Sequence, residues 1–375
     1  MTHVLLATGD LAPDRDHYDE SYADTRDVLL AADVVFGQLE TSFAASGTRL
    51  PQARHAVRAR PEGAAALARA GFTIISMAGN HCMDWGREAF CETRAHLEAA
   101  GIAVVGAGKD IAEARRPVVQ ALGDGTRVAF LAYSSILPHS YWADERRPGC
   151  APMRAHTVYE QIEHDQPGTP ARVHTYPHRA DLAAMQEDIR RAKDQADLVF
   201  VSQHWGIHFV RAALADYEHD VARAAIEAGA DAVIGGHPHI IKGCQVIGGK
   251  PVFHSLCNFA TDLRMDEEHA RSKSWNEIRG LAEEWEPDFV GLYNFPAASR
   301  LAMVARFEVA GGKLLRSGFM PLYIGRDAVP RFAPRGSAEY RAVVEYLEAV
   351  TQEAGLNGAF RETDEMVELT QRGWS

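Results

Sequence analysis

Six short apolar runs, each ending in polar or glycine residues, most strongly constrain how this 375-residue chain can fold. The runs are residues 4–8, 34–39, 73–78, 128–133, 198–202 and 232–234. Their length and their content of β-branched residues are typical of buried strands. Stretches with a helical pattern lie between several of the runs, at residues 62–70, 87–100, 179–195 and 215–229. This alternation predicts an α/β layered fold.

The pattern changes after about residue 245, where strands are expected to follow one another without helices. These candidate strands are residues 251–256, 301–309 and 313–324. Gly311 and Gly312 predict a hairpin turn between the last two strands. We therefore expect a main domain over residues 1–330 and a helical C-terminal extension over residues 331–375. The extension has candidate helices at residues 337–354 and 359–370.

Two long irregular segments interrupt the regular pattern, and we interpret both as insertions. Residues 137–178 are rich in proline, histidine, tyrosine and charge, and residues 262–300 carry Trp275, Trp285 and Tyr293. Long irregular segments in a domain often form lids or binding loops, so we expect both to border a site. Surface or oligomer contacts are an equal alternative, and a homo-oligomer is compatible with the sequence.

Charge and cysteine content narrow the classes of partner and compartment. The formal net charge of −12 disfavours nucleic-acid phosphates and anionic membrane surfaces as partners. The five cysteines include no CxxC spacing, which indicates reduced thiols rather than a disulfide framework. The N-terminal residues resemble no signal peptide, and no apolar run reaches the roughly 18–20 residues of a membrane span. We therefore expect a soluble, cytoplasmic protein.

Potential metal ligands stand where the predicted strands end. The residues are Asp10, Glu40, Asn80 with His81, His204, and His237 with His239. Ligands of α/β sheets bind beyond the carboxyl ends of the strands, so we expect these side chains to meet. Imidazole, carboxylate and amide oxygen suit a divalent ion such as Mn²⁺, Fe²⁺ or Zn²⁺. Helix capping by polar residues is the simpler alternative for such positions.

The motifs formed by these residues resemble those of a known family. They are Gly9-Asp10, Leu39-Glu40, Gly79-Asn80-His81 with Asp84 and Gly86, His204-Trp205-Gly206, Gly236-His237-Pro238-His239 and Ser255-Leu256-Cys257-Asn258-Phe259. In this order, over roughly residues 4–262, they resemble the CapA family of poly-γ-glutamate capsule synthesis, within the metallophosphoesterase (calcineurin-like) superfamily. The resemblance implies a four-layer α/β/β/α sandwich with a site for two divalent metal ions.

The resemblance also implies a role for each ligand. Asp10 and His239 would bind the first ion, and Glu40 would bridge both ions. The second ion would be held by Asn80, His204 and His237. His81 would be the general acid, with Asp84 either orienting it or capping the helix that follows. Leu11 and Ala12 follow Asp10 where the superfamily usually has Asp-x-His, so occupancy by one ion is an alternative.

Other residues are weaker candidates. Those for substrate binding are Trp205, Asp262, Arg264 and Arg300. Trp205 is expected to form a wall of the site, whereas solvated surface charge is the simpler reading of each arginine. Cys257 replaces the glycine usual in relatives, and we interpret it as a small buried residue.

The favoured function is hydrolysis of a phosphoester or a related anionic substrate at two metal ions, with His81 protonating the leaving group. One alternative is a metal-assisted epimerase or isomerase of an amino-acid or peptide-like substrate, which suits a one-ion site. A third is a non-catalytic component of capsule polymer synthesis.

Overall fold

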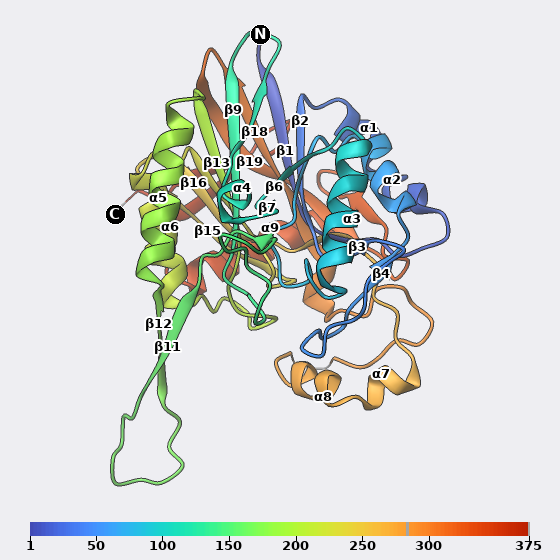
Figure 1. Cartoon of the computed structure of the whole chain (residues 1–375). Coiled ribbons are helices and arrows are strands. Elements are labelled where there is room, and N and C mark those ends of the chain that lie inside the picture. Colours follow the sequence, from blue (N-terminus) through green and yellow to red (C-terminus); the bar gives the residue numbers. More distant parts are fainter. Residues whose placement is uncertain (283–284, 374–375) are drawn as a thin grey trace.

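Two large β-sheets form the centre of the protein in this computed structural model, which describes residues 1–282 and 285–373 (Figure 1). Residues 283 and 284 of the second predicted insertion, and 374 and 375 of the predicted extension, lie outside the described residues. The path of the larger sheet is β21 (Gly358–Glu362), β22 (Val367–Gln371), β19 (Lys313–Ile324), β18 (Leu301–Ala310), β1 (His3–Ala12), β2 (Val34–Leu39), β5 (Ile74–Ser76) and β6 (Ala103–Val105), with β17 (Asn258–Thr261) beside β1 and β20 (Pro330–Phe332) beside β19. The smaller sheet has the order β15 (Ile241–Ile247), β16 (Lys250–Leu256), β14 (Ala232–Gly236), β13 (Leu198–His204), β9 (Arg127–Ser134) and β8 (Val118–Ala121).

Parallel strands form one half of the larger sheet and the middle of the smaller one, as the alternation of strands and helices predicts. In the larger sheet β1, β2, β5 and β6 run parallel, and in the smaller sheet β9, β13, β14 and β16 do. Strand β18 pairs antiparallel with both β1 and β19. The predicted turn at Gly311 and Gly312 connects β18 to β19. The mixed α/β class and the late antiparallel strands are therefore confirmed.

Aromatic side chains hold the two sheets face to face. Phe36 of β2 stacks on Phe130 of β9 with ring centroids 5.5 Å apart. Phe130 stacks in turn on Phe200 of β13 at 5.1 Å, and Phe200 meets Phe307 of β18 at 5.0 Å. Each of these rings is almost fully buried, so the contacts between the sheets form the main hydrophobic core.

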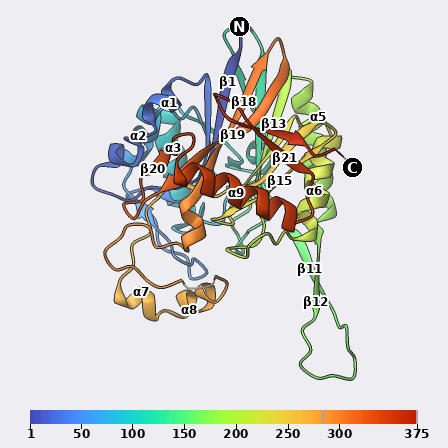
Figure 2. The ribbon, with the colours of Figure 1, turned by 180° about the vertical axis from the view of Figure 1, so that it is seen from behind.

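Helices lie against the outer faces of both sheets. Their bounds are α1 (Arg26–Leu30), α2 (Glu62–Ala70), α3 (Gly86–Ala99), α4 (Ile111–Ala114), α5 (Arg179–Lys193), α6 (Asp216–Glu227), α7 (Glu267–Arg271), α8 (Lys273–Arg279) and α9 (Ala338–Glu353), with 3₁₀ turns at Tyr18–Tyr22 and Ala297–Arg300. Helices α5 and α6 bury Met185, Ile189 and Val221 against the smaller sheet. Helices α1 to α3 lie beside the larger sheet, and α9 crosses the side seen from behind (Figures 1 and 2). In the part of the chain that the structure describes, no helix combines the length and apolarity needed to cross a membrane.

The predicted helix at residues 359–370 is wrong, because this segment forms the hairpin β21–β22. Pairing of β22 with β19, in the register Phe319 opposite Val367, overrides any helical preference. The Val367 side chain is fully buried, and the alternate residue Leu369 is nearly so, which suits a strand with one face on the core. Helix α9 agrees with the predicted helix at 337–354.

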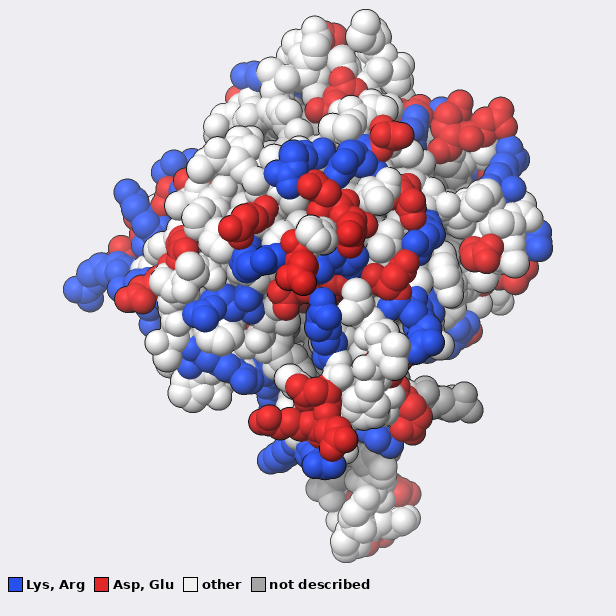
Figure 3. Space-filling model, turned by 90° about the vertical axis from the view of Figure 1, so that its right-hand side faces the viewer, with Lys and Arg blue, Asp and Glu red and all other residues white. Residues whose placement is uncertain are grey.

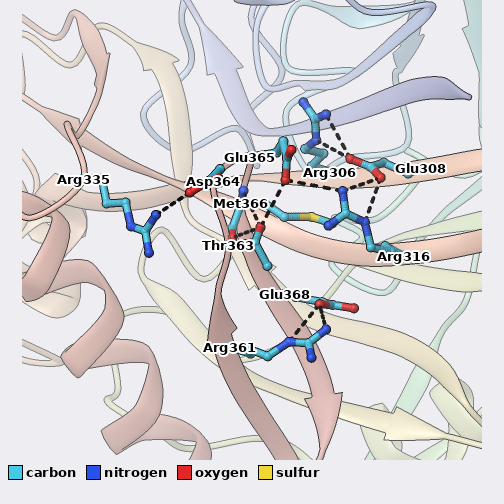
Figure 4. Close-up of polar contacts among 10 residues, drawn as sticks. All are labelled: Arg306, Glu308, Arg316, Arg335, Arg361, Thr363, Asp364, Glu365, Met366 and Glu368. Atoms are coloured by element: carbon cyan, nitrogen blue, oxygen red, sulfur yellow. Dashed lines mark hydrogen bonds and ion pairs between the residues drawn. The ribbon is translucent and has the colours of Figure 1, made fainter.

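Charged contacts fasten the hairpin to the neighbouring strands and to the loop before α9 (Figure 4). Arg316 of β19 bonds to Glu308 of β18 and lies 3.4 Å from Glu365 in the hairpin turn. Arg335 donates to Asp364 at 2.8 Å from the other side. The C-terminal segment is thus built into the larger sheet.

The two insertions differ in structure. The first contributes β10 (Gly149–Cys150), paired with β7 (Ala107–Gly108), and the hairpin of β11 (Ala155–Glu160) and β12 (Arg172–Pro177). The hairpin of β11 and β12 projects from the body of the protein (Figure 1). The other insertion carries α7 and α8, which lie below the short pair β3 (Ser42–Phe43) and β4 (Arg58–Ala59). On the face drawn in Figure 3, basic and acidic side chains alternate instead of forming one continuous field.

Candidate metal centre

The potential ligands lie at the carboxyl ends of parallel strands from both sheets. Asp10 lies near the end of β1, and Glu40 directly follows β2. His204 is the last residue of β13, and His237 follows β14. The face-to-face packing of the sheets brings these strand ends together, as the sequence predicts.

Asp10, Glu40 and His239 form a compact group, which we call the candidate metal centre. Each can offer one ligand atom, these atoms lie within 4.8 Å of one another, and all three residues are buried. His239 Nδ1 lies 3.4 Å from Asp10 Oδ2, and His239 Nε2 lies 3.8 Å from Glu40 Oε2. Two carboxylates and an imidazole at this spacing are a donor set that a divalent ion can use.

A second group adjoins the centre through Glu40. His204 Nε2 lies 3.1 Å from Glu40 Oε1 and 2.6 Å from Asn80 Oδ1. The ring of His237 is centred 4.8 Å from that of His204. Glu40 therefore lies between His239 on one side and His204 on the other.

Several ligand atoms are buried without a hydrogen-bond partner among the described residues. They are Asp10 Oδ1, Glu40 Oε1 and Oε2, His204 Nδ1, and His237 Nδ1. Buried polar atoms are rarely left unpaired, because each costs on the order of 1–3 kcal/mol. Several such atoms occur in this one group of residues. Bound cations would be the partners that these atoms lack.

The electrostatics of the group also fit cations. Burial raises the pKa of Glu40 to about 7, and the nearby Asp10 adds to the rise, while His81 and His239 oppose it. Burial lowers the pKa values of His204 and His237 well below the usual range, so both imidazoles are neutral and have a free lone pair. Burial also acts to lower the pKa of His239, but Asp10 and Glu40 outweigh it and raise that pKa. A cation bound there would replace the proton that these carboxylates attract.

The backbone around the ligands is unusually constrained. His237 and His239 have φ of 96° and 55°, in the left-handed region that non-glycine residues rarely adopt. The His237 N–H donates to Asp10 Oδ2 at 3.0 Å, which holds the carboxylate against this turn. Gly236 precedes the turn, and a Cβ atom there would lie 2.7 Å from Asp10 Oδ1. Non-glycine residues in strained conformations cluster at functional sites.

Gly236→Ala should therefore weaken metal binding by about 10- to 100-fold, the loss usual when the support of a ligand is disturbed. The added methyl group displaces the Asp10 carboxylate without removing a ligand. Calorimetric titration of metal-free protein with Mn²⁺ measures the change. Gly123→Ala is the matched control, because a Cβ there has only an ordinary contact of 3.4 Å with His3. Equal affinities in Gly236→Ala and wild type would mean that Asp10 binds no ion.

His81 and Asp84 form a separate pair beside the ligands. His81 Nδ1 lies 2.6 Å from Asp84 Oδ2, and the Tyr141 hydroxyl donates to Asp84 Oδ1 at 2.7 Å. Burial acts to lower the pKa of His81, but the Asp84 carboxylate more than compensates, and the pKa rises to about 9. The pair thus holds a protonated imidazole next to the candidate metal centre, and of the two roles expected for Asp84 the contact with His81 is the one seen, since no side chain among the described residues caps the following helix α3.

Sequence comparison assigns the segment that carries all of these residues to one protein family. The profile described as bacterial capsule synthesis protein PGA_cap matches residues 4–263, which is more than half of the chain and includes every candidate ligand. The chain belongs to the PGA_cap family.

Relatives of this PGA_cap protein are found among capsule proteins. The PGA biosynthesis protein CapA of Bacillus subtilis is 28% identical over 51% of this chain and 43% of its own length. The capsule biosynthesis protein CapA of Bacillus anthracis is 29% identical over 54% of this chain and 44% of its own length. The chain thus spans less than half of either protein. The calcineurin-like phosphoesterase YfkN of Bacillus subtilis has 13% identity and a TM-score of 0.42 over 94% of this chain and 97% of its own, a likeness too loose to carry an argument.

The structure adds two roles that the sequence did not assign, to His208 and Asn258. The His208 ring is centred 3.9 Å from that of His237, and its Nε2 atom is buried without a partner among the described residues. It lies in the loop that follows His204 and β13, and this nearness in sequence to a candidate ligand is the signal that could have indicated it. Asn258 lies 2.8 Å from His239 Nδ1 and donates to the Tyr293 hydroxyl at 2.8 Å, so its Oδ1 accepts from His239. This arrangement leaves His239 Nε2 free for a cation.

Two predicted substrate contacts in the PGA_cap chain are wrong. Trp205 follows His204 in the chain, and adjacent side chains at a strand end point to opposite faces. Its ring is therefore buried in the core beneath α5 and α6, where Nε1 donates to the His254 carbonyl at 2.9 Å. Arg300 donates to the Ile324 carbonyl of β19 at 3.2 Å and is not among the residues that line the adjacent cavity.

Asp262 and Arg264 do line a cavity of about 790 Å³ beside Glu40 and His239. Asp262 is already paired with Arg15 and accepts the Asp14 N–H at 2.8 Å, so it organises the wall. Arg264 is exposed and has only a 3.4 Å contact with the Asp14 carbonyl. Cys257 is fully buried, as expected.

Only one insertion forms an extensive wall of this cavity. The second insertion contributes much of the lining, including α8, which confirms the expectation that it borders the site. The first contributes Pro138 near its start, whereas the hairpin β11–β12 projects away, so the expectation is wrong for that hairpin.

Proposed function

We propose that this PGA_cap protein is a metal-dependent hydrolase of a phosphoester or a related anionic substrate. The observation that carries the proposal is the buried set of unpaired carboxylate and imidazole atoms beside a cavity that the protonated His81 also lines. Facing sheets with helices on their outer sides support the four-layer sandwich that such enzymes share. The names of the relatives suggest that the reaction serves capsule synthesis.

We assign the residues to two ion sites that share Glu40. Asp10, Glu40 and His239 would hold one ion, and Glu40, Asn80, His204 and His237 would hold the other. Divalent ions, with Mn²⁺, Fe²⁺ or Zn²⁺ favoured by these donors, supply charge stabilisation for anionic oxygens when bound.

The protein's own groups position and protonate the substrate. Asp84 accepts from His81 Nδ1, which leaves the Nε2 proton of the imidazolium available to a leaving oxygen in the cavity. Tyr141 fixes Asp84 from its other oxygen, so the imidazole is held in one orientation. The exposed Arg264 at the cavity can attract an anionic group.

The proposal predicts that hydrolysis of p-nitrophenyl phosphate or bis(p-nitrophenyl) phosphate disappears after chelation and returns when Mn²⁺, Fe²⁺ or Zn²⁺ is added. His239→Ala should abolish this metal-dependent hydrolysis, because it removes a ligand of the compact group. His164→Ala, in the exposed loop between β11 and β12, is the matched control and should behave like the wild type. Absence of hydrolysis with all three metals would contradict the proposal and favour a non-catalytic role in capsule polymer synthesis.

A further inference from the structure

The cavity beside the candidate metal centre is larger and more apolar than a phosphate group requires. Its volume of about 790 Å³ is in the range of sites that enclose whole organic ligands. Glu40, Asn80 and His81 line the part that belongs to the site already described. Much of the remaining lining comes from the second insertion, and apart from Arg264 this part has no role in the proposed chemistry.

A continuous series of aromatic contacts leads from a candidate ligand into that second part. The ring of Phe209 is centred 5.8 Å from His239 and 4.8 Å from Trp285. Trp285 meets Trp275 of α8 in an edge-on contact at 4.6 Å. Phe295 adds a further ring 5.1 Å from His239. These side chains line the cavity, so an apolar group placed against them would adjoin the ion sites.

The two tryptophans also have unused hydrogen-bonding capacity. Trp275 is 1% exposed and Trp285 is 6% exposed, and the Nε1 atom of each is buried without a hydrogen-bond partner among the described residues. An indole N–H is a donor only, and buried tryptophans usually find an acceptor. An acceptor oxygen of a ligand in this cavity would supply the missing partner once an indole ring turns its N–H toward it.

Polar groups at the cavity complete the specification of the ligand. Arg54 and Arg264 are both exposed and both line it. Leu281 lines it as well, with 47% of its surface exposed, which leaves apolar surface in contact with solvent. An anionic compound with an apolar body covers this surface, whereas a small, wholly polar phosphate does not.

We propose that the cavity selects anionic esters whose organic group is aromatic, or apolar and of similar size, and carries an acceptor oxygen for the indole N–H groups. This inference rests on the proposed function for the position of the anionic group at the ions. The aromatic group lies against Phe209, Trp275 and Trp285, and the second insertion is the segment that determines specificity.

Calorimetric titration of the metal-loaded protein with three phosphonates tests the inference without requiring turnover. Methylphosphonate, phenylphosphonate and 4-acetylphenylphosphonate share the anionic group and differ in the organic group. Burial of the ring should make phenylphosphonate bind roughly ten- to a hundredfold more tightly than methylphosphonate. The acetyl oxygen should tighten binding further. Equal affinity for the methyl and phenyl compounds, or no binding of either, would overturn the inference.

Two variants locate the effect. Leu281→Asp places a negative charge in the cavity and should remove the preference for phenylphosphonate, while the matched control Leu315→Asp, on exposed β19, should retain it. Trp285→Phe keeps an aromatic wall but removes one N–H, so it should lose the advantage of the acetyl group and keep that of the phenyl group. A phenyl preference unchanged by Leu281→Asp would place the ring elsewhere and overturn the assignment.

The outcome separates this inference from the proposed function. If the protein hydrolyses p-nitrophenyl phosphate in a metal-dependent reaction but binds methyl- and phenylphosphonate equally, the function stands and the inference fails. If phenylphosphonate is preferred, and Leu281→Asp removes the preference in a protein that hydrolyses no phosphoester, the inference stands and the function fails.

Discussion

Replacing His81 by alanine is expected to lower the turnover of a phosphoester with a poor leaving group by about 10²- to 10⁴-fold, the range for loss of one general acid. Metal content should remain that of the wild type, because His81 Nδ1 is engaged by Asp84 and the residue is not part of the compact ligand group. The loss should shrink for p-nitrophenyl phosphate, whose leaving group needs no proton. Turnover of phenyl phosphate and p-nitrophenyl phosphate, with elemental analysis of the same samples, measures both effects.

Asp84→Asn tests the same general acid by changing the pKa of His81 without removing its imidazole. The Asp84 carboxylate raises the pKa of His81, and a general acid is active below its pKa, so turnover falls as pH rises through that value. Loss of the carboxylate lowers the pKa, and the alkaline limb of the pH profile should move to lower pH. A His81→Ala variant that loses metal in step with activity would identify His81 as a ligand. Full turnover of phenyl phosphate in His81→Ala would show that another group is the acid.

Glu40→Gln is expected to remove at least one metal ion per chain and the hydrolytic activity with it. Both oxygens of Glu40 are buried without a hydrogen-bond partner among the described residues, and they lie 3.1 Å from His204 Nε2 and 3.8 Å from His239 Nε2. An amide of the same size keeps the shape but loses the negative charge that holds two cations close together. Elemental analysis of the purified variant gives the stoichiometry directly.

The same substitution should leave the metal-free protein at least as stable as the wild type. Burial and the neighbouring Asp10 raise the pKa of Glu40, so its ionised form destabilises the fold at neutral pH when no cation is present. Glu308→Gln is the matched control, since Glu308 is also a buried carboxylate but pairs with Arg306 and Arg316, and it should keep the full metal content. Wild-type stoichiometry in Glu40→Gln would mean that Glu40 is not the bridge.

Much of the site could be predicted because its ligands depend on strand ends. Buried parallel strands leave a clear apolar signature, and Asp10, Glu40 and His204 each lie at the end of one. Their convergence follows from the way parallel strands align. The pair of His81 and Asp84 was one of two alternatives, because a spacing of three residues places them on one turn and Asp84 also precedes a helix.

Other features depend on contacts that no local pattern encodes. The hairpin β21–β22 forms because β19 offers an edge for pairing, and that edge is distant in the sequence. Trp205 lies next to a ligand in sequence, yet strand alternation turns it into the core. His208 and Trp285 reach the cavity from loops, and Trp275 from a short helix within the second insertion, where spacing gives little information on direction.

The most direct test of the central claim is a calorimetric titration of metal-free protein with Mn²⁺, with the stoichiometry confirmed by elemental analysis. Our account predicts two ions per wild-type chain and a lower number in His239→Ala, with unchanged circular dichroism. One ion per wild-type chain would contradict the paired sites around Glu40. No bound ion in a folded wild-type protein would contradict the account as a whole.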